Sequence, residues 1–113
     1  MKKNKKVLII DDERDFCFLL KSYLSKKNYS IQVANNLSRG MELLEDSAPD
    51  IIFLDNNLPD GLGWDMVPYI FSTYPGVKLN LISAYHPTST LFEMKNLKIW
   101  EKPLDFRSIE NYL

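Results

Sequence analysis

Five polar side chains follow short apolar runs in this sequence, at positions where they could act together chemically. They are Asp11, Asp12, Asp55, Ser83 and Lys102. Three carboxylates that share one crevice repel one another, which raises at least one of their pKa values unless a cation is present. Mg²⁺ (or Mn²⁺) suits such a site, because a hard divalent ion prefers oxygen ligands. A carboxylate nucleophile, a divalent cation, an ammonium and a hydroxyl together indicate a site that holds a phosphoryl group on an aspartate.

The apolar runs predict the strands that would bring these side chains together. Apolar runs cover 7–10, 51–54, 77–82 and 99–100, and a weaker run covers 30–34. Continuous apolar runs are typical of strands buried on both faces of a parallel sheet, whereas the alternation in 30–34 favours a half-buried edge strand. The carboxyl ends of parallel strands lie at one edge of the sheet, where ligands bind in open α/β folds.

Segments of helical length separate the strands. The predicted helices are 13–27, 37–45, 63–74, 88–95 and 105–113. Pro68 predicts an offset first turn or a kink in the third helix, and Asp105 is a candidate cap for the last one. Strand and helix alternate five times, which predicts a doubly wound α/β domain with helices on both faces of the sheet.

Length and composition exclude several classes of protein. The chain has 113 residues, of which 45% are hydrophobic, so we expect a single domain over 1–113. Its net charge of −1 gives no basis for direct binding to nucleic acid or to an anionic membrane. No apolar run approaches the length of a membrane span. The one cysteine, Cys17, cannot form an internal disulfide, which suits a reducing cytoplasm, and we expect it to be a packing residue.

Each polar residue taken alone has a simpler explanation. An isolated Asp after a strand is usually a helix cap or a turn residue, and a lone Lys-Pro pair is usually a turn. Here four strand ends carry chemically matching side chains in chain order. This joint arrangement favours the phosphoryl site.

With these motifs the chain resembles the receiver domains of two-component response regulators over essentially its whole length. The matching segments are 7–13 (Val-Leu-Ile-Ile-Asp-Asp-Glu), 55–63 (Asp-Asn-Asn-Leu-Pro-Asp-Gly-Leu-Gly), 83–84 (Ser-Ala) and 102–103 (Lys-Pro). The resemblance implies a flavodoxin-like fold with the strand order 2-1-3-4-5. It also implies phosphorylation by a histidine kinase or a histidine phosphotransfer protein, which would switch an unidentified output partner or domain.

The resemblance further implies a role for each matching side chain. Asp55 would be the phosphoacceptor and a metal ligand. Asp12 would bind Mg²⁺ directly, Asp11 mostly through water, and the backbone carbonyl of Asn57 would supply another ligand.

Two further residues would contact the phosphoryl group itself. Lys102 would pair with it, and Ser83 would hydrogen-bond it after transfer. The Lys102–Pro103 peptide bond is expected to be cis, which proline makes accessible.

The sequence departs from the family where the signal is read out. Receivers usually have Tyr or Phe three residues before the lysine, but this chain has Ile99, and the segment between Ser83 and Lys102 is a few residues short. Trp100 cannot replace the missing ring, because strand side chains alternate and it should face the other side of the sheet. Tyr85 is a better candidate for a replacement ring. We therefore expect phosphorylation to pull Ser83 inward and to reorganise the loop from Ala84 to Pro87 and the short helix after it, while Ile99 barely moves.

Two other functions remain open from the sequence. An aspartate-nucleophile phosphatase would have Asp-x-Asp after the first strand, whereas this chain has Asp-Asp-Glu at 11–13 and Asn57 two residues after Asp55. A degenerate receiver that only binds other proteins is the second alternative, which Ile99 keeps open. We expect a signalling receiver rather than an enzyme, apart from its own phosphotransfer and autodephosphorylation.

Overall fold

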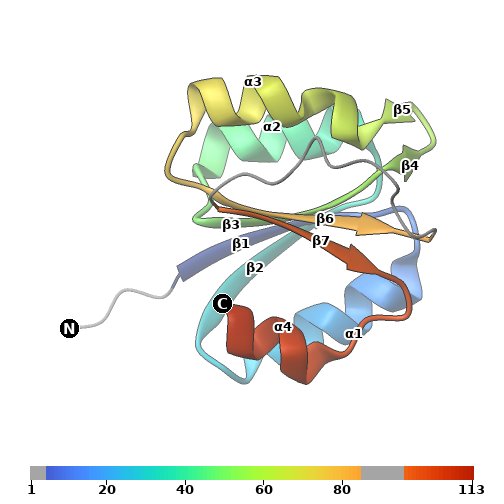
Figure 1. The fold of residues 1–113 in the computed structure, drawn as a ribbon, viewed down its shortest axis with the longest axis vertical. Coiled ribbons are helices and arrows are strands. Elements are labelled where there is room, and N and C mark those ends of the chain that lie inside the picture. Colours follow the sequence, from blue (N-terminus) through green and yellow to red (C-terminus); the bar gives the residue numbers. More distant parts are fainter. Residues whose placement is uncertain (1–4, 85–95) are drawn as a thin grey trace.

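The computed structural model describes residues 5–84 and 96–113, which form a parallel sheet covered by helices on both faces (Figure 1). The strands of this sheet are β1 (Lys5–Ile10), β2 (Tyr29–Ala34), β3 (Ile51–Asp55), β6 (Lys78–Ser83) and β7 (Leu97–Glu101). The helices are α1 (Arg14–Ser25), α2 (Leu37–Ser47), α3 (Val67–Thr73) and α4 (Phe106–Tyr112). The predicted helix over 88–95 lies outside the described residues.

The strand order confirms the predicted topology. The sheet runs β2-β1-β3-β6-β7, and every neighbouring pair is parallel. Counting only the strands of this sheet, the order is 2-1-3-4-5. The labels β4 (Asn57–Leu58) and β5 (Gly61–Leu62) belong to a small antiparallel pair beyond the end of β3. Chain order reverses direction between β1 and β3, which is the switch point where open α/β sheets bind ligands.

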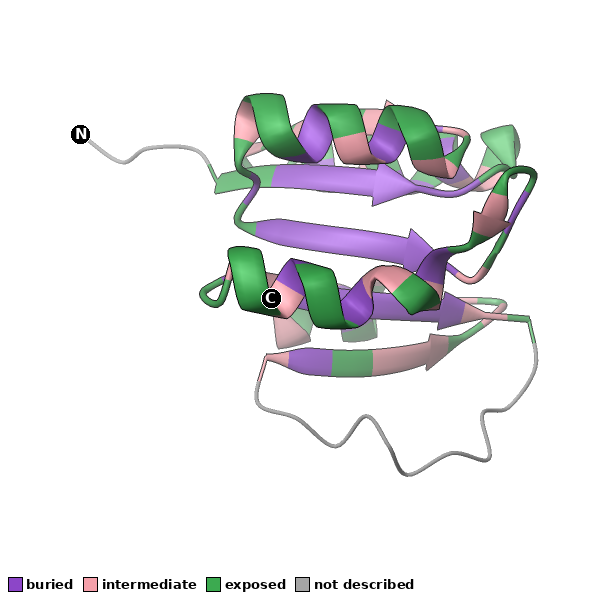
Figure 2. Cartoon of the chain, turned by 90° about the horizontal axis from the view of Figure 1, so that it is seen from above, coloured by how far each residue is buried: buried purple, intermediate pink, exposed green. Residues whose placement is uncertain are grey.

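Burial follows the apolar pattern of each strand. All five residues of β3 are buried, as are the last four of β1, whereas β2 alternates as an edge strand does. In Figure 2 the buried colour is concentrated in the central strands and on the inward faces of the helices. The sequence therefore predicted correctly which strands lie in the middle of the sheet.

Two apolar layers hold the helices against the sheet. One layer lies under α2 and α3, and the other lies under α1 and α4 (Figure 1). Ile99 packs against the first layer and Trp100 against the second, which confirms that they face opposite sides. The indole nitrogen of Trp100 donates to the side-chain oxygen of Asn80, a buried residue of β6, at 2.9 Å.

Local sequence signals explain where the helices begin. Asn36 caps α2, because its side chain accepts a hydrogen bond from the Arg39 N–H, and Asp105 likewise caps α4. A 3₁₀ turn over Gly63–Met66 precedes α3, and Pro68 lies in the first turn of α3 itself. The α-helix therefore starts later than the predicted segment, which is the offset first turn expected from Pro68. Within the described residues, none of the helices combines the length and the apolar composition that crossing a bilayer requires.

Candidate functional site

The predicted site residues lie together at the carboxyl edge of the sheet. Asp11 follows β1, Asp55 ends β3, Ser83 ends β6 and Lys102 follows β7. The strand registers bring these ends level, since Asp55 lies opposite Ile82 and the Lys102 backbone N–H donates to the Ser83 carbonyl at 2.8 Å. The parallel sheet thus brings together side chains that are 91 positions apart in the sequence (102 − 11).

Three carboxylates form a compact acidic cluster at this edge. One side-chain oxygen from each of Asp11, Asp12 and Asp55 lies within 4.8 Å of the other two. Two oxygens on opposite sides of an Mg²⁺ ion are separated by about 4 Å. Asp11 is fully buried and Asp55 is 6% exposed, whereas Asp12 is open to solvent. The cluster therefore has two buried acids and one exposed acid, at a spacing close to that of a magnesium site.

Burial and mutual repulsion make the cluster difficult to ionise. The pKa of Asp55 is raised to about 6, first because the side chain is buried and second because the Asp11 carboxylate is near, although the Lys102 ammonium partly opposes the rise. Burial also raises the pKa of Asp11. A hydrogen bond from the Glu13 N–H to Oδ1 of Asp11, at 2.9 Å, lowers this pKa but does not outweigh the burial. The sequence-based expectation that at least one carboxyl has a raised pKa agrees with this environment.

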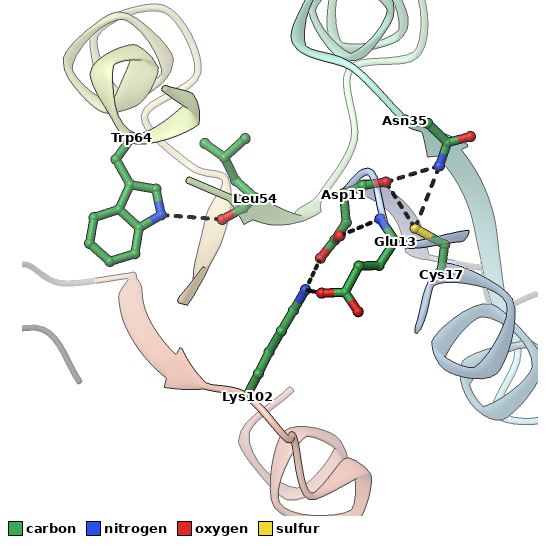
Figure 3. Close-up of polar contacts among 7 residues, drawn as sticks. All are labelled: Asp11, Glu13, Cys17, Asn35, Leu54, Trp64 and Lys102. Carbon is green, nitrogen blue, oxygen red and sulfur yellow. Dashed lines mark hydrogen bonds and ion pairs between the residues drawn. The ribbon is translucent and has the colours of Figure 1, made fainter. Parts of the chain in front are cut away.

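The Lys102 ammonium lies beside Asp11, one of these three carboxylates (Figure 3). Its Nζ is 3.0 Å from Oδ2 of Asp11 and 2.6 Å from Oε1 of Glu13, and it lies 4.8 Å from the centroid of the Phe16 ring. Burial lowers the pKa of Lys102, but the contacts with Glu13 and Asp11 outweigh it and leave the pKa raised. The side chain is therefore a permanent positive charge at neutral pH.

Two side-chain hydrogen bonds also hold the backbone carbonyl of Asp11 in place. Its carbonyl oxygen accepts hydrogen bonds from the Asn35 side chain at 2.9 Å and from the Cys17 thiol at 3.2 Å (Figure 3). Burial raises the pKa of Cys17 to about 12, so the thiol stays protonated and can donate this bond. Cys17 is thus a packing residue, as predicted.

Hydrogen bonds between its two ends stabilise the loop that follows Asp55. Asn56 accepts two hydrogen bonds, from the Gly63 N–H to its carbonyl at 2.9 Å and from the Trp64 N–H to its side chain at 3.1 Å. A Cβ atom at Gly63 would collide with the Asp55 carbonyl oxygen, so only glycine fits at this position. Asn57 begins β4 in this loop and is exposed.

Asp60 connects the same loop to α2, a contact that sequence reasoning missed. Its two carboxylate oxygens accept hydrogen bonds from the backbone N–H groups of Leu37 and Ser38, at 2.7 and 2.8 Å. These bonds lower the pKa of Asp60. An acidic residue in a loop can satisfy the free N–H groups of a helix start, but its position in the sequence did not indicate which helix.

Of the predicted switch residues, Ala84 and Pro103 follow strand ends at this edge, whereas Ile99 lies within β7. Ile99 is half-buried opposite Leu81, and Ala84 is exposed after β6. The Lys102–Pro103 peptide bond is cis, as the resemblance implied. Tyr85 lies outside the described residues, so its role stays a prediction from the sequence.

The chain belongs to the response regulator receiver domain family, whose sequence model matches residues 7–113. It is 33% identical over 104 residues to the response regulator protein PilR of Pseudomonas aeruginosa, an alignment that covers 89% of this chain but 23% of PilR. A two-component response regulator from Clostridium difficile has the same fold, with a TM-score of 0.87 and 25% identity over 96% of this chain and 92% of that one. The fold also matches that of TrrA from Thermotoga maritima, solved in complex with Mg²⁺-BeF, with a TM-score of 0.83 and 23% identity over 96% of this chain and 95% of that one.

These matches define the chain as a receiver domain of two-component signalling, the class in which response regulators pair with histidine kinases and with output domains. The chain spans less than a quarter of PilR, so what the whole of PilR does is not carried over to it.

Proposed function

We propose that Asp55 is the phosphoacceptor and that the domain over 1–113 passes on a signal when this residue is phosphorylated. The observation that supports the proposal is the position of Asp55, a buried carboxylate that shares one sheet edge with two further carboxylates and a lysine ammonium. A nucleophilic oxygen, a metal-binding pair of acids and a fixed cation are nearly all that phosphoryl transfer requires of a protein.

The acidic cluster fits a divalent ion. Oδ2 of Asp11 is buried, and the Lys102 ammonium lies 3.0 Å from it, so this carboxylate already has one cation beside it. Asp12 and Asp55 would hold Mg²⁺ or Mn²⁺ directly, Asp11 mostly through water, and Asn57 through its backbone carbonyl. When bound, the ion supplies positive charge against the developing charge of the phosphoryl oxygens.

The transfer step uses one oxygen of Asp55. This oxygen attacks the phosphorus of a phosphohistidine, so a P–O bond forms while the P–N bond breaks. The electron pair of the P–N bond returns to the imidazole nitrogen, which then takes up a proton. Lys102 would move to the transferred phosphoryl group, and the Ser83 hydroxyl would donate a hydrogen bond to it. Hydrolysis of the acyl phosphate by water releases inorganic phosphate and restores the Asp55 carboxylate.

The donor would be a histidine kinase or a histidine phosphotransfer protein. The exposed surface of α1 beside the site carries two large apolar side chains, Phe18 and Leu19, which are 68% and 56% exposed. A groove borders this surface, with a lining that includes Glu13, Ala84 and Lys102. Exposed apolar groups beside a polar reaction site are typical of a protein docking surface. A single cysteine cannot form an internal disulfide, which suits a reducing compartment, and we propose that the reaction takes place in the cytoplasm.

The proposal is tested by intact mass measurement after incubation with acetyl phosphate and Mg²⁺. We expect one adduct of about 80 Da on the parent chain, as a single phosphorylation gives, and none on Asp55→Asn. Asp46→Asn makes the same chemical change on the exposed surface of α2 and should keep the adduct. An adduct that persists in Asp55→Asn would contradict the assignment, as would repeated turnover without an adduct, which a phosphatase would show.

A further inference from the structure

Glu13 occupies the position before α1 where a helix cap is expected, but its side chain does not act as a cap. The backbone at Glu13 is extended, and the side chain makes no hydrogen bond to the first turn. Instead its Oε1 accepts a hydrogen bond from Nζ of Lys102 at 2.6 Å (Figure 3). Ser, Thr, Asn or Asp would cap this helix better than Glu. The contact with Lys102, 89 positions away, gives Glu13 a different role.

The surroundings of Lys102 show what this contact does. The side chain is 15% exposed, and its ammonium lies between Asp11, Glu13 and the Phe16 ring. Within the described residues, no ion pair joins Lys102 to Asp55. The ammonium is therefore held on the α1 side of the site.

We propose that Glu13 is a positioning residue that competes with the phosphoryl group for Lys102. In the resting protein it holds the ammonium on the α1 side, and the ammonium must leave Glu13 to reach a phosphoryl group on Asp55. This proposal rests on the proposed role of Asp55 as phosphoacceptor. Asp11 is buried and remains a neighbour of Lys102, whereas the Glu13 side chain is 62% exposed and can swing into water when the lysine leaves.

The size of the effect follows from the exposure of Glu13. An ion pair with a solvent-exposed partner is weak, so breaking it weakens phosphoryl binding only about two- to fivefold. Removing the competition should tighten binding by the same factor. Glu13 would therefore adjust the affinity for the phosphoryl group only modestly, because Lys102 keeps its buried ion pair with Asp11.

Charge alone could imitate this result, because any carboxylate near the site repels an anion. Two further variants separate the explanations. Glu13→Asp keeps the charge but shortens the side chain by one methylene, so it loses the contact with Lys102. Asp15→Asn removes a charge from the exposed surface of α1, two positions further along, and serves as the matched control.

The test is the affinity for beryllofluoride, a phosphoryl mimic, measured by calorimetric titration at saturating Mg²⁺. We expect the dissociation constant to fall about two- to fivefold in both Glu13→Gln and Glu13→Asp, and to stay within about 1.5-fold in Asp15→Asn. Thermal unfolding of each variant verifies that it folds.

Three outcomes would overturn the proposal. They are an unchanged or weaker affinity in Glu13→Gln, a parental affinity in Glu13→Asp, and an equal gain in Asp15→Asn. Failure of the underlying function would look different. The parent chain would then bind no beryllofluoride and form no adduct with acetyl phosphate, and the role of Glu13 would fall with that of Asp55.

Discussion

Asp55→Asn should make the metal-free protein more stable at pH 8, although the residue is the proposed centre of its function. The substitution keeps the size of the side chain and removes a charge that is buried beside Asp11. Stability and function conflict at this position, because the site concentrates negative charge that only a cation can relieve.

The magnitude follows from the pKa of Asp55, which burial and the Asp11 charge raise from 3.8 to about 6. At about 1.4 kcal/mol per pKa unit, ionisation of the folded protein above pH 6 costs about 3 kcal/mol of stability. The direction of the change in stability with pH follows from proton binding. Between pH 3.8 and 6 the folded state holds the proton more tightly than the unfolded state, so the penalty grows with pH and is constant above 6. Asp55→Asn should therefore gain about 2–3 kcal/mol at pH 8 and about 1 kcal/mol at pH 4.5.

Urea denaturation at several pH values measures this difference directly. Asp46→Asn is the matched control, since it removes an exposed carboxylate and should change the free energy of unfolding by less than about 0.5 kcal/mol. Saturating Mg²⁺ should stabilise the parent more than Asp55→Asn and so reduce the gap. An Asp55→Asn protein no more stable than its parent at pH 8, or a gain independent of pH, would refute the reasoning.

Three further predictions concern the metal, the loop and the donor. Mg²⁺ should raise the melting temperature of the parent, and Asp12→Ala should remove most of that shift; an unchanged shift would mean that the ion binds elsewhere. Gly63→Ala should lower the free energy of unfolding by about 1–3 kcal/mol in urea titrations, because the added methyl group collides with the Asp55 carbonyl, whereas parental stability would show that the loop can move aside. Phe18→Ser should slow phosphorylation by a phosphohistidine protein but not by acetyl phosphate, and equal rates with both donors would contradict docking on α1.

The fold was predictable because its main signals are local. The apolar runs of β1, β3 and β6 are each buried on both faces, and the alternating run of β2 lies at the sheet edge. The offset start of α3 followed from Pro68, whose ring excludes an earlier uninterrupted helix. Once the sheet is parallel, its topology alone places Asp11, Asp55, Ser83 and Lys102 at one edge.

The contacts that sequence reasoning missed are those that a side chain makes with residues far away in the chain. Glu13 meets Lys102 across 89 positions, and the Asp60 carboxylate reaches the start of α2 from 22 and 23 positions away. No periodicity records such pairings, because they depend on rotamers and on the distance between strand ends. The poor helix-capping ability of Glu13 was the only local sign of its other contact.

Reductive trapping tests the phosphoacceptor role of Asp55 most directly. Borohydride reduces an aspartyl phosphate to homoserine, so peptide mapping after treatment with acetyl phosphate and Mg²⁺ identifies the phosphorylated residue. We predict homoserine at position 55 and unmodified aspartate at 11 and 12. Homoserine at either of those two positions, or at none of the three in a chain that gained the phosphoryl mass, would contradict the assignment of Asp55.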